Sequence, residues 1–136
     1  MRYLIDTNIC IYIMNHHPES VIDKFKQCEL SDIGVSTISV SELQYGVSKS
    51  RHRENNQTRL EEFLVPLEIC PYDRIAAAAY GDIRQRLEKS GQIIGPLDML
   101  IAAHAFGHDW TLITNNENEF NRIEGLKIEN WTRRST

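Results

Sequence analysis

Short apolar runs, each followed by polar residues and then by a helix-forming stretch, constrain the fold of this chain most strongly. They lie at residues 3–5, 33–35, 67–70, 111–114 and 127–129. Runs of this length between turn-forming or polar residues are typical of buried strands. Strands that alternate with helices form βαβ units, so the pattern predicts an α/β fold with a mainly parallel sheet covered on both faces.

The segments between these runs carry helical signals of different strength. Residues 75–89 carry the strongest one, because this segment is alanine-rich and amphipathic and ends at Ser90-Gly91. Another clear helix begins at Pro96 and continues through Ala105, with proline in its first turn. Weaker signals predict helices at residues 9–14, 19–28, 38–47, 60–65 and 116–120. Residues 51–56 are only polar and charged.

Nothing along the chain marks a second domain or a membrane segment. A length of 136 residues fits one domain, and no repeat or linker interrupts it, so we predict a single domain over residues 1–136. No apolar run is long enough for a secretory signal or a membrane span. Cys10, Cys28 and Cys70 are scattered without disulfide or zinc-site spacing, which favours a reducing compartment. We therefore expect a cytoplasmic protein without membrane contact.

The overall charge argues against simple tracking of nucleic-acid phosphates. The chain has 15 Lys and Arg against 19 Asp and Glu, a net charge of −4, whereas phosphate-tracking proteins are usually basic. The objection weakens if several acids hold divalent cations, because the ions reverse the local field. Three local basic groups are candidate phosphate contacts: Lys49, Arg51 and Arg53; Arg84, Arg86 and Lys89; Arg133 and Arg134.

Four polar residues stand where the predicted strands end or the next helices begin. Asp6 follows the first strand directly, and Glu42 lies one to two turns into the helix after the second strand. Asp98 is in the first turn of the helix that Pro96 begins, and Asn116 follows the fourth strand. Sites in open α/β sheets form beyond the carboxyl ends of the strands, so we expect these side chains to converge on one rim.

Each of these residues also has a purely structural explanation. Asp6 suits a helix N-cap, and Glu42 has capping-box spacing from Ser39. Asp98 suits the positive end of a helix dipole. Asn116 has capping-box spacing to the glutamate at position 119. Their shared position at one rim is what favours a functional site.

Carboxylates gathered at low dielectric repel one another, and a hard divalent cation removes that penalty. Mg2+ and Mn2+ prefer oxygen ligands, and such ions activate water and orient phosphodiesters. His16, His17, His104 and His108 show no ligand pairing in the sequence, which favours a hard-oxygen site over zinc. His104, on an apolar helix face, is expected to be a hydrogen-bonded core residue.

Four ordered segments carry a family resemblance: LIDTN at residues 4–8, VSEL at 40–43, GPLD at 95–98 and LITNN at 112–116. Together they resemble the PIN-domain family, and more closely the VapC-type toxins of bacterial type II toxin–antitoxin pairs. The resemblance implies a three-layer α/β sandwich with a mainly parallel five-stranded sheet. It also implies an endoribonuclease, dependent on Mg2+ or Mn2+, that cleaves structured RNA such as tRNA or rRNA and so inhibits translation.

The resemblance further implies roles and partners. Asp6, Glu42 and Asp98 would be the catalytic metal-site acids, and Asn116 would take the fourth catalytic position, where many PIN domains have aspartate. Glu119 is a secondary candidate beside it. A VapB-type antitoxin would neutralise the enzyme, with the helix at residues 9–14 and the segment 60–64 as candidate docking surfaces. A homodimer and a toxin–antitoxin hetero-oligomer are also implied.

Two other functions compete with this hypothesis. One is a PIN-like module of weak catalytic power that binds RNA or protein, which Asn116 and the acidic net charge favour. The other is a phosphotransfer or phosphatase domain with Asp6 as nucleophile. That chemistry usually requires a second acid two residues later, and position 8 is Asn8.

Overall fold

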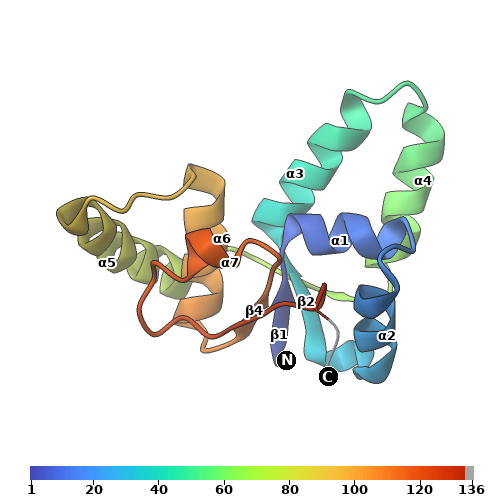
Figure 1. The fold of residues 1–136 in the computed structure, drawn as a ribbon. Helices are drawn as coiled ribbons and strands as arrows, with labels where there is room; N and C mark the ends of the chain where they lie inside the picture. The colour runs from blue at the N-terminus through green and yellow to red at the C-terminus, as the bar shows by residue number, and fades with distance from the viewer. Residues whose placement is uncertain (134–136) are drawn as a thin grey trace.

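The computed structural model describes residues 1–133 and is an α/β fold around one parallel sheet (Figure 1). Its strands are β1 (Tyr3–Ile5), β2 (Ile33–Ser36), β3 (Glu68–Cys70), β4 (Thr111–Ile113) and β5 (Ile128–Glu129). They lie in the order β3-β2-β1-β4-β5, and every neighbouring pair is parallel. Central β1 places Tyr3 beside Ile33 on one side and Thr111 on the other. The predicted five-stranded parallel sheet is confirmed.

The helices are α1 (Thr7–Met14), α2 (Glu19–Gln27), α3 (Thr37–Ser48), α4 (Arg53–Leu64), α5 (Arg74–Ser90), α6 (Pro96–Gly107) and α7 (Glu117–Phe120). A short 3-10 helix, Leu30–Asp32, precedes β2. The longest helix, α5, begins where Asp73 accepts the Ala76 backbone N–H and ends at Gly91, whose φ of 69° is left-handed. Both ends of α5 are therefore set by local residues, which explains why this helix was predictable from the sequence.

The sheet buries a different apolar layer on each face, as alternating strand side chains require. Leu4 and Leu112 pack into the cluster formed with α5, α6 and Phe120. Ile5 and Ile113, the next residue of each strand, pack into the other cluster, with α1, α2 and the fully buried Trp131. In Figure 1, α5 and α6 accordingly lie on one side of the strands and α1 and α2 on the other. The three-layer sandwich is confirmed.

Helix α4 differs from its prediction, because it begins at Arg53 rather than within residues 60–65. Its first half lacks apolar side chains at helical spacing, so periodicity did not indicate it. Polar contacts with α3 and with the loop that follows α3 hold this half in place instead. Gln57 bonds Gln44 of α3, and Asn56 Nδ2 donates to Ser50 Oγ of the loop at 3.0 Å. Among residues 1–133, no helix is both long and apolar enough to cross a membrane.

Candidate active site

Asp6 lies where β1 ends and α1 begins, and it caps the helix with a side chain that also faces other acids. Its backbone N–H bonds the Ile113 carbonyl at 3.0 Å, which continues the β1–β4 pairing. Its side-chain Oδ1 accepts the Ile9 backbone N–H at 2.9 Å and so caps α1. The carboxylate is nevertheless buried, 5% exposed, and it interacts electrostatically with Glu42. The capping bond from the Ile9 N–H therefore positions this carboxylate without neutralising its negative charge.

Burial raises the pKa of Asp6 to about 6. Hydrogen bonds from the Thr114 hydroxyl and the Ile9 N–H oppose this change, while the negative charge of Glu42 adds to it. Because burial outweighs these hydrogen bonds, the carboxylate carries uncompensated negative charge whenever it is ionised.

Glu42 reaches the same rim from α3, which follows β2. Ser36 Oγ caps this helix by accepting the Ile38 N–H at 3.1 Å. Ser39 instead lies inside the helix, and its buried hydroxyl has no hydrogen-bond partner among the described residues. The capping box of Ser39 and Glu42 is therefore not formed. Glu42 Oε1 accepts a hydrogen bond from the Thr7 hydroxyl at 2.7 Å instead, which ties it to the first residue of α1.

Asp98 lies in the first turn of α6, and Glu119 of α7 lies over the same turn. A methyl group placed on Gly95 would lie 3.6 Å from Asp98 Oδ2 and 3.5 Å from Glu119 Oε1, so both oxygens face this glycine. Glu119 Oε1 also accepts the Gly95 backbone N–H at 2.6 Å. Burial, followed by the charges of Glu119, Asp6 and Glu42, raises the pKa of Asp98 to about 7.

Asn116 contacts the cluster through Glu119. Its side chain makes no helix-capping bond, although Asn116 occupies the N-cap position of α7. Its Nδ2 donates to Glu119 Oε2 at 2.5 Å, and its backbone N–H bonds Thr114 Oγ1 at 3.0 Å. The rim thus carries four interacting carboxylates, Asp6, Glu42, Asp98 and Glu119, with the Asn116 amide directing the last one.

The donor set of this acidic cluster fits a hard divalent cation. It supplies carboxylate oxygens, which Mg2+ and Mn2+ prefer, and no sulfur or imidazole ligand. Burial is the main cause of the raised pKa values of Asp6 and Asp98, and the charges of neighbouring carboxylates add to both. A cation bound among these oxygens would compensate the buried charge and relieve the repulsion.

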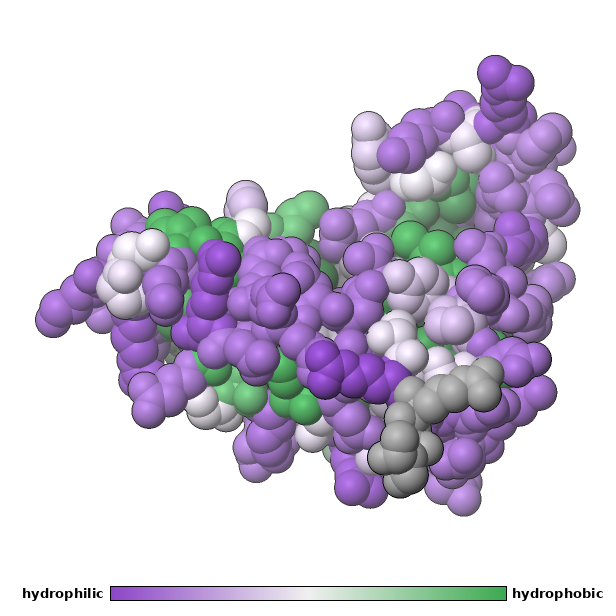
Figure 2. Space-filling model, in the orientation of Figure 1, coloured by the Kyte–Doolittle hydropathy of each residue, from purple (hydrophilic) through white to green (hydrophobic). Residues whose placement is uncertain are grey.

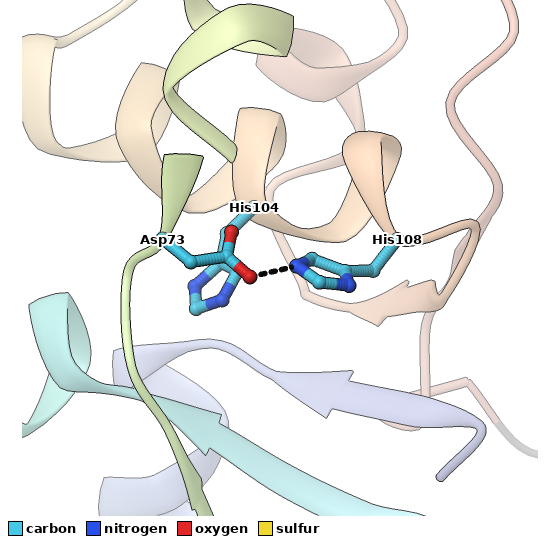
Figure 3. Close-up of side chains that lie close together, drawn as sticks. All are labelled: Asp73, His104 and His108. Carbon is cyan, nitrogen blue, oxygen red and sulfur yellow. Dashed lines mark hydrogen bonds and ion pairs between the residues drawn. The ribbon is translucent and has the colours of Figure 1, made fainter. Parts of the chain in front are cut away.

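A second group of ligand-type side chains lies away from these acids and was missed by the sequence analysis. Asp73, His104 and His108 each offer a ligand atom, and these atoms all lie within 4.8 Å of one another (Figure 3). The absence of ligand pairing predicted for the histidines is therefore wrong for His104 and His108. Their four-residue spacing on α6 was a usable signal, because it places them on one helix face. The prediction that His104 is a hydrogen-bonded core residue is confirmed, since it is fully buried and bonds Ser36.

The candidate basic contacts have different surroundings. Arg84 pairs with Glu88 at 2.9 Å, and Arg133 pairs with Glu117 at 2.6 Å. Lys49 lies over the ring of Tyr45, which is 65% exposed. Arg134 lies outside the described residues. Each of the other two basic groups therefore has a cation paired with a glutamate, whereas Lys49 lies against an exposed aromatic ring.

Comparison with known proteins places this geometry in context. The PIN domain matches residues 3–126. The chain is 46% identical to "Ribonuclease VapC2" of Rickettsia felis, with 96% of this chain and 98% of that protein covered. It is 38% identical to "tRNA(fMet)-specific endonuclease VapC" of Salmonella typhimurium over the same shares of the two chains. A crystal structure of DNA-bound VapBC from Salmonella typhimurium superposes with a TM-score of 0.91 at 38% identity, covering 96% of this chain and 98% of that one.

Proposed function

Because this chain belongs to the PIN-domain family of VapC-type ribonucleases, we propose that it is a metal-dependent endoribonuclease toxin of a toxin–antitoxin pair. The observation that carries the proposal is the convergence of Asp6, Glu42, Asp98 and Glu119 at the carboxyl ends of β1 and its neighbours. Three of these acids match the residues expected from the sequence. Asn116 joins the site as the partner of Glu119 rather than as a free fourth acid.

In the proposed mechanism, Asp6 and Asp98 would hold the principal Mg2+ or Mn2+ ion, with Glu42 and Glu119 beside them. Such an ion would neutralise charge at the scissile phosphate and make a water more acidic. Thr7 orients Glu42 through its 2.7 Å hydrogen bond, so that this carboxylate accepts a proton from the attacking water. The water oxygen bonds to phosphorus as the bond from phosphorus to the 3′ oxygen breaks. The products are a 5′-phosphate and a 3′-hydroxyl that takes its proton from solvent.

A structured RNA is the proposed substrate, and tRNA is the first class to test. The Salmonella typhimurium relative is described as specific for tRNA(fMet). Cleavage of tRNA would inhibit translation. Because translation takes place in the cytoplasm, we propose a cytoplasmic location for the enzyme. All three cysteines are free, which fits a reducing compartment. Lys49, beside exposed Tyr45, offers a cation and a stacking surface for RNA.

A VapB-type antitoxin is the proposed inhibitory partner, as in the VapBC complexes to which the chain is similar. An apolar groove of about 190 Å³ lies between α1, α3 and α4, and Figure 2 shows apolar surface in this region. Its apolar lining includes Ile11, Met14, Leu43, Val47 and Leu60. Glu42 also lines the groove, so a helix seated there could extend a basic side chain to the acidic cluster. Residues of both predicted docking segments line this groove: Ile11 and Met14 of the first and Leu60 of the second. We further propose a homodimer of this chain within the toxin–antitoxin hetero-oligomer.

The alternative of a weakly catalytic binding module rested on Asn116 and on the acidic net charge. The hydrogen bond from Asn116 to Glu119 weakens that alternative, because it supplies a carboxylate beside Asp98. The phosphotransfer alternative is weaker still, since Asp6 Oδ1 is engaged by the Ile9 N–H.

The test is a cleavage assay with purified tRNA, with Mg2+ or Mn2+ and with EDTA, beside an Asp98→Asn variant. We expect discrete fragments with 5′-phosphate ends that require metal and disappear in the variant. A folded wild-type protein, free of antitoxin, that leaves both tRNA and total cellular RNA intact would reject the nuclease in favour of the binding module.

A further inference from the structure

A compact group of two histidines and one aspartate lies between the start of α5 and the end of α6. Asp73 is the N-cap of α5, while His104 lies in the last turn of α6 and His108, four residues later, is the C-cap of that helix. Asp73 Oδ2 and His108 Nε2 are 2.8 Å apart. Figure 3 shows the Asp73 carboxylate between the two imidazole rings. One ligand atom from each residue lies within 4.8 Å of the others.

His104 is the member that a structural role alone explains least well. It is 0% exposed, and its Nδ1 lies 2.8 Å from Ser36 Oγ. Its Nε2 is buried and has no hydrogen-bond partner among the described residues. A backbone hydrogen bond with Pro71 opposes the lowering of the His104 pKa, although Nε2 makes no hydrogen bond of ordinary geometry among the described residues. A buried polar nitrogen without a well-formed hydrogen bond is destabilising, so in the tautomer that carries its proton on Nδ1 a ligand that takes up the Nε2 lone pair would be favoured.

The surroundings hold both rings in place. His108 stacks on Trp110 with ring centroids 4.3 Å apart and an interplanar angle of 11°. Tyr72 packs edge-on against His104 at 5.5 Å. Ser36 anchors one ring nitrogen of His104 and leaves the other free, which is how an outer-shell partner commonly orients a metal-binding histidine. The rings would therefore lose little freedom on binding an ion.

We propose that Asp73, His104 and His108 form a binding site for a transition-metal ion of the Zn2+ class. Two imidazole nitrogens and one carboxylate oxygen are typical zinc ligands, with water in the fourth position. The ion would replace the hydrogen bond between Asp73 and His108 and occupy the free nitrogen of His104. It would join the first turn of α5 to the end of α6 and so stabilise this helix pair.

This site is distinct from the acidic cluster. Asp98 and His104 belong to the same helix, and at 1.5 Å per residue they are about 9 Å apart along its axis. The two sites also differ in chemistry, because carboxylates select Mg2+ or Mn2+ whereas imidazoles select zinc, copper or nickel. One ion cannot serve both sites.

The test is zinc titration of the tag-free, chelator-treated full chain, by calorimetry and by thermal unfolding. All titrations use protein that carries the Asp98→Asn substitution, called the background protein. The substitution weakens any zinc binding by the acidic cluster. We expect one zinc ion per chain. At a free zinc concentration 100 times the Kd, the ratio of folded to unfolded protein should rise about 100-fold.

Two variants and one control assign the ion to this site. Asp73→Asn keeps a good helix cap, and His108→Asn removes one imidazole; each should weaken zinc binding by about 10-fold or more. His17→Asn alters an exposed histidine outside the site and should leave binding unchanged. Co2+ in place of zinc should give the visible absorption of a tetrahedral site, and this absorption should be lost in His108→Asn. The proposal is overturned if zinc does not bind, or if it binds Asp73→Asn and His108→Asn as tightly as the background protein.

Discussion

Asn116 Nδ2 donates a 2.5 Å hydrogen bond to Glu119 Oε2, and the other oxygen of the same carboxylate accepts the Gly95 N–H at 2.6 Å. Both oxygens of Glu119 are thereby fixed above the first turn of α6, where its charge acts on Asp98. Although position 116 carries a neutral amide, the cluster still has a fourth carboxylate. It is supplied by Glu119, three residues after Asn116.

Glu119→Gln should lower the rate of RNA cleavage by about 100-fold, because it removes a charge that helps hold the cation. Asn116→Ala should lower it by about 10-fold, since the carboxylate stays but loses one of its two orienting bonds. Single-turnover rates over a range of Mg2+ concentrations measure both effects. Glu117→Gln is the matched control, because Glu117 pairs with Arg133. Equal rates for Glu119→Gln and Glu117→Gln would remove Glu119 from the site.

The stability of the metal-free protein should fall as pH rises from about 4 to about 7. The carboxyl pKa values of Asp6 and Asp98 are about 6 and about 7 in the folded chain, above the 3.8 of an unperturbed aspartate. The folded state therefore binds more protons than the unfolded state in this window, and deprotonation disfavours folding. Denaturant unfolding in EDTA at pH 5 and pH 8 measures the difference.

Asp98→Asn should raise the metal-free free energy of unfolding at pH 8 by about 1–2 kcal/mol, because a half-buried charge beside other carboxylates is gone. Saturating Mg2+ should stabilise wild type more than this variant. If the variant is instead less stable than wild type in EDTA at pH 8, the repulsion inferred for the acidic cluster is wrong.

Thr7→Val should reduce cleavage by about 10-fold with a loss of stability near 1 kcal/mol or less. The valine keeps the shape of the side chain but removes the donor to Glu42 Oε1. Glu42 would then be free to rotate away from the attacking water. A pH–rate profile separates this effect from simple destabilisation, since a positioning residue should change the profile. An unchanged rate and profile would show that Glu42 needs no such support.

Ile11→Asp should weaken antitoxin binding by about 10-fold or more while leaving RNA cleavage by the free toxin intact. Ile11 is 37% exposed and lines the groove between α1, α3 and α4, where a charge would oppose an apolar helix. Val65→Asp is the control, because Val65 is 82% exposed and lies outside that groove. Calorimetry with the VapB-type antitoxin proposed as its partner measures both. Equal effects of the two substitutions would place the antitoxin elsewhere.

Helix α4 shows where prediction from the sequence stopped. Its second half carries the buried Leu60, and that half was predicted. Its first half is held by Gln57 and Asn56, whose partners Gln44 and Ser50 lie on another segment of chain. Apolar periodicity cannot indicate a helix whose first half is held by polar side-chain contacts with the preceding helix and loop.

The alternation of strands and helices was predictable from the sequence alone, as were the positions of Asp6 and Asp98 at strand and helix ends and of Glu42 one to two turns into its helix. These features depend on local periodicity, caps and turn residues, which are readable within a few positions. Only the tertiary structure decided that Glu42 bonds Thr7 rather than capping its own helix, and that Glu119 fills the place beside Asp98. It likewise brought Asp73 to His104 and His108. Such contacts join residues far apart in the chain, and their distances follow from how α5, α6 and α7 pack around the sheet.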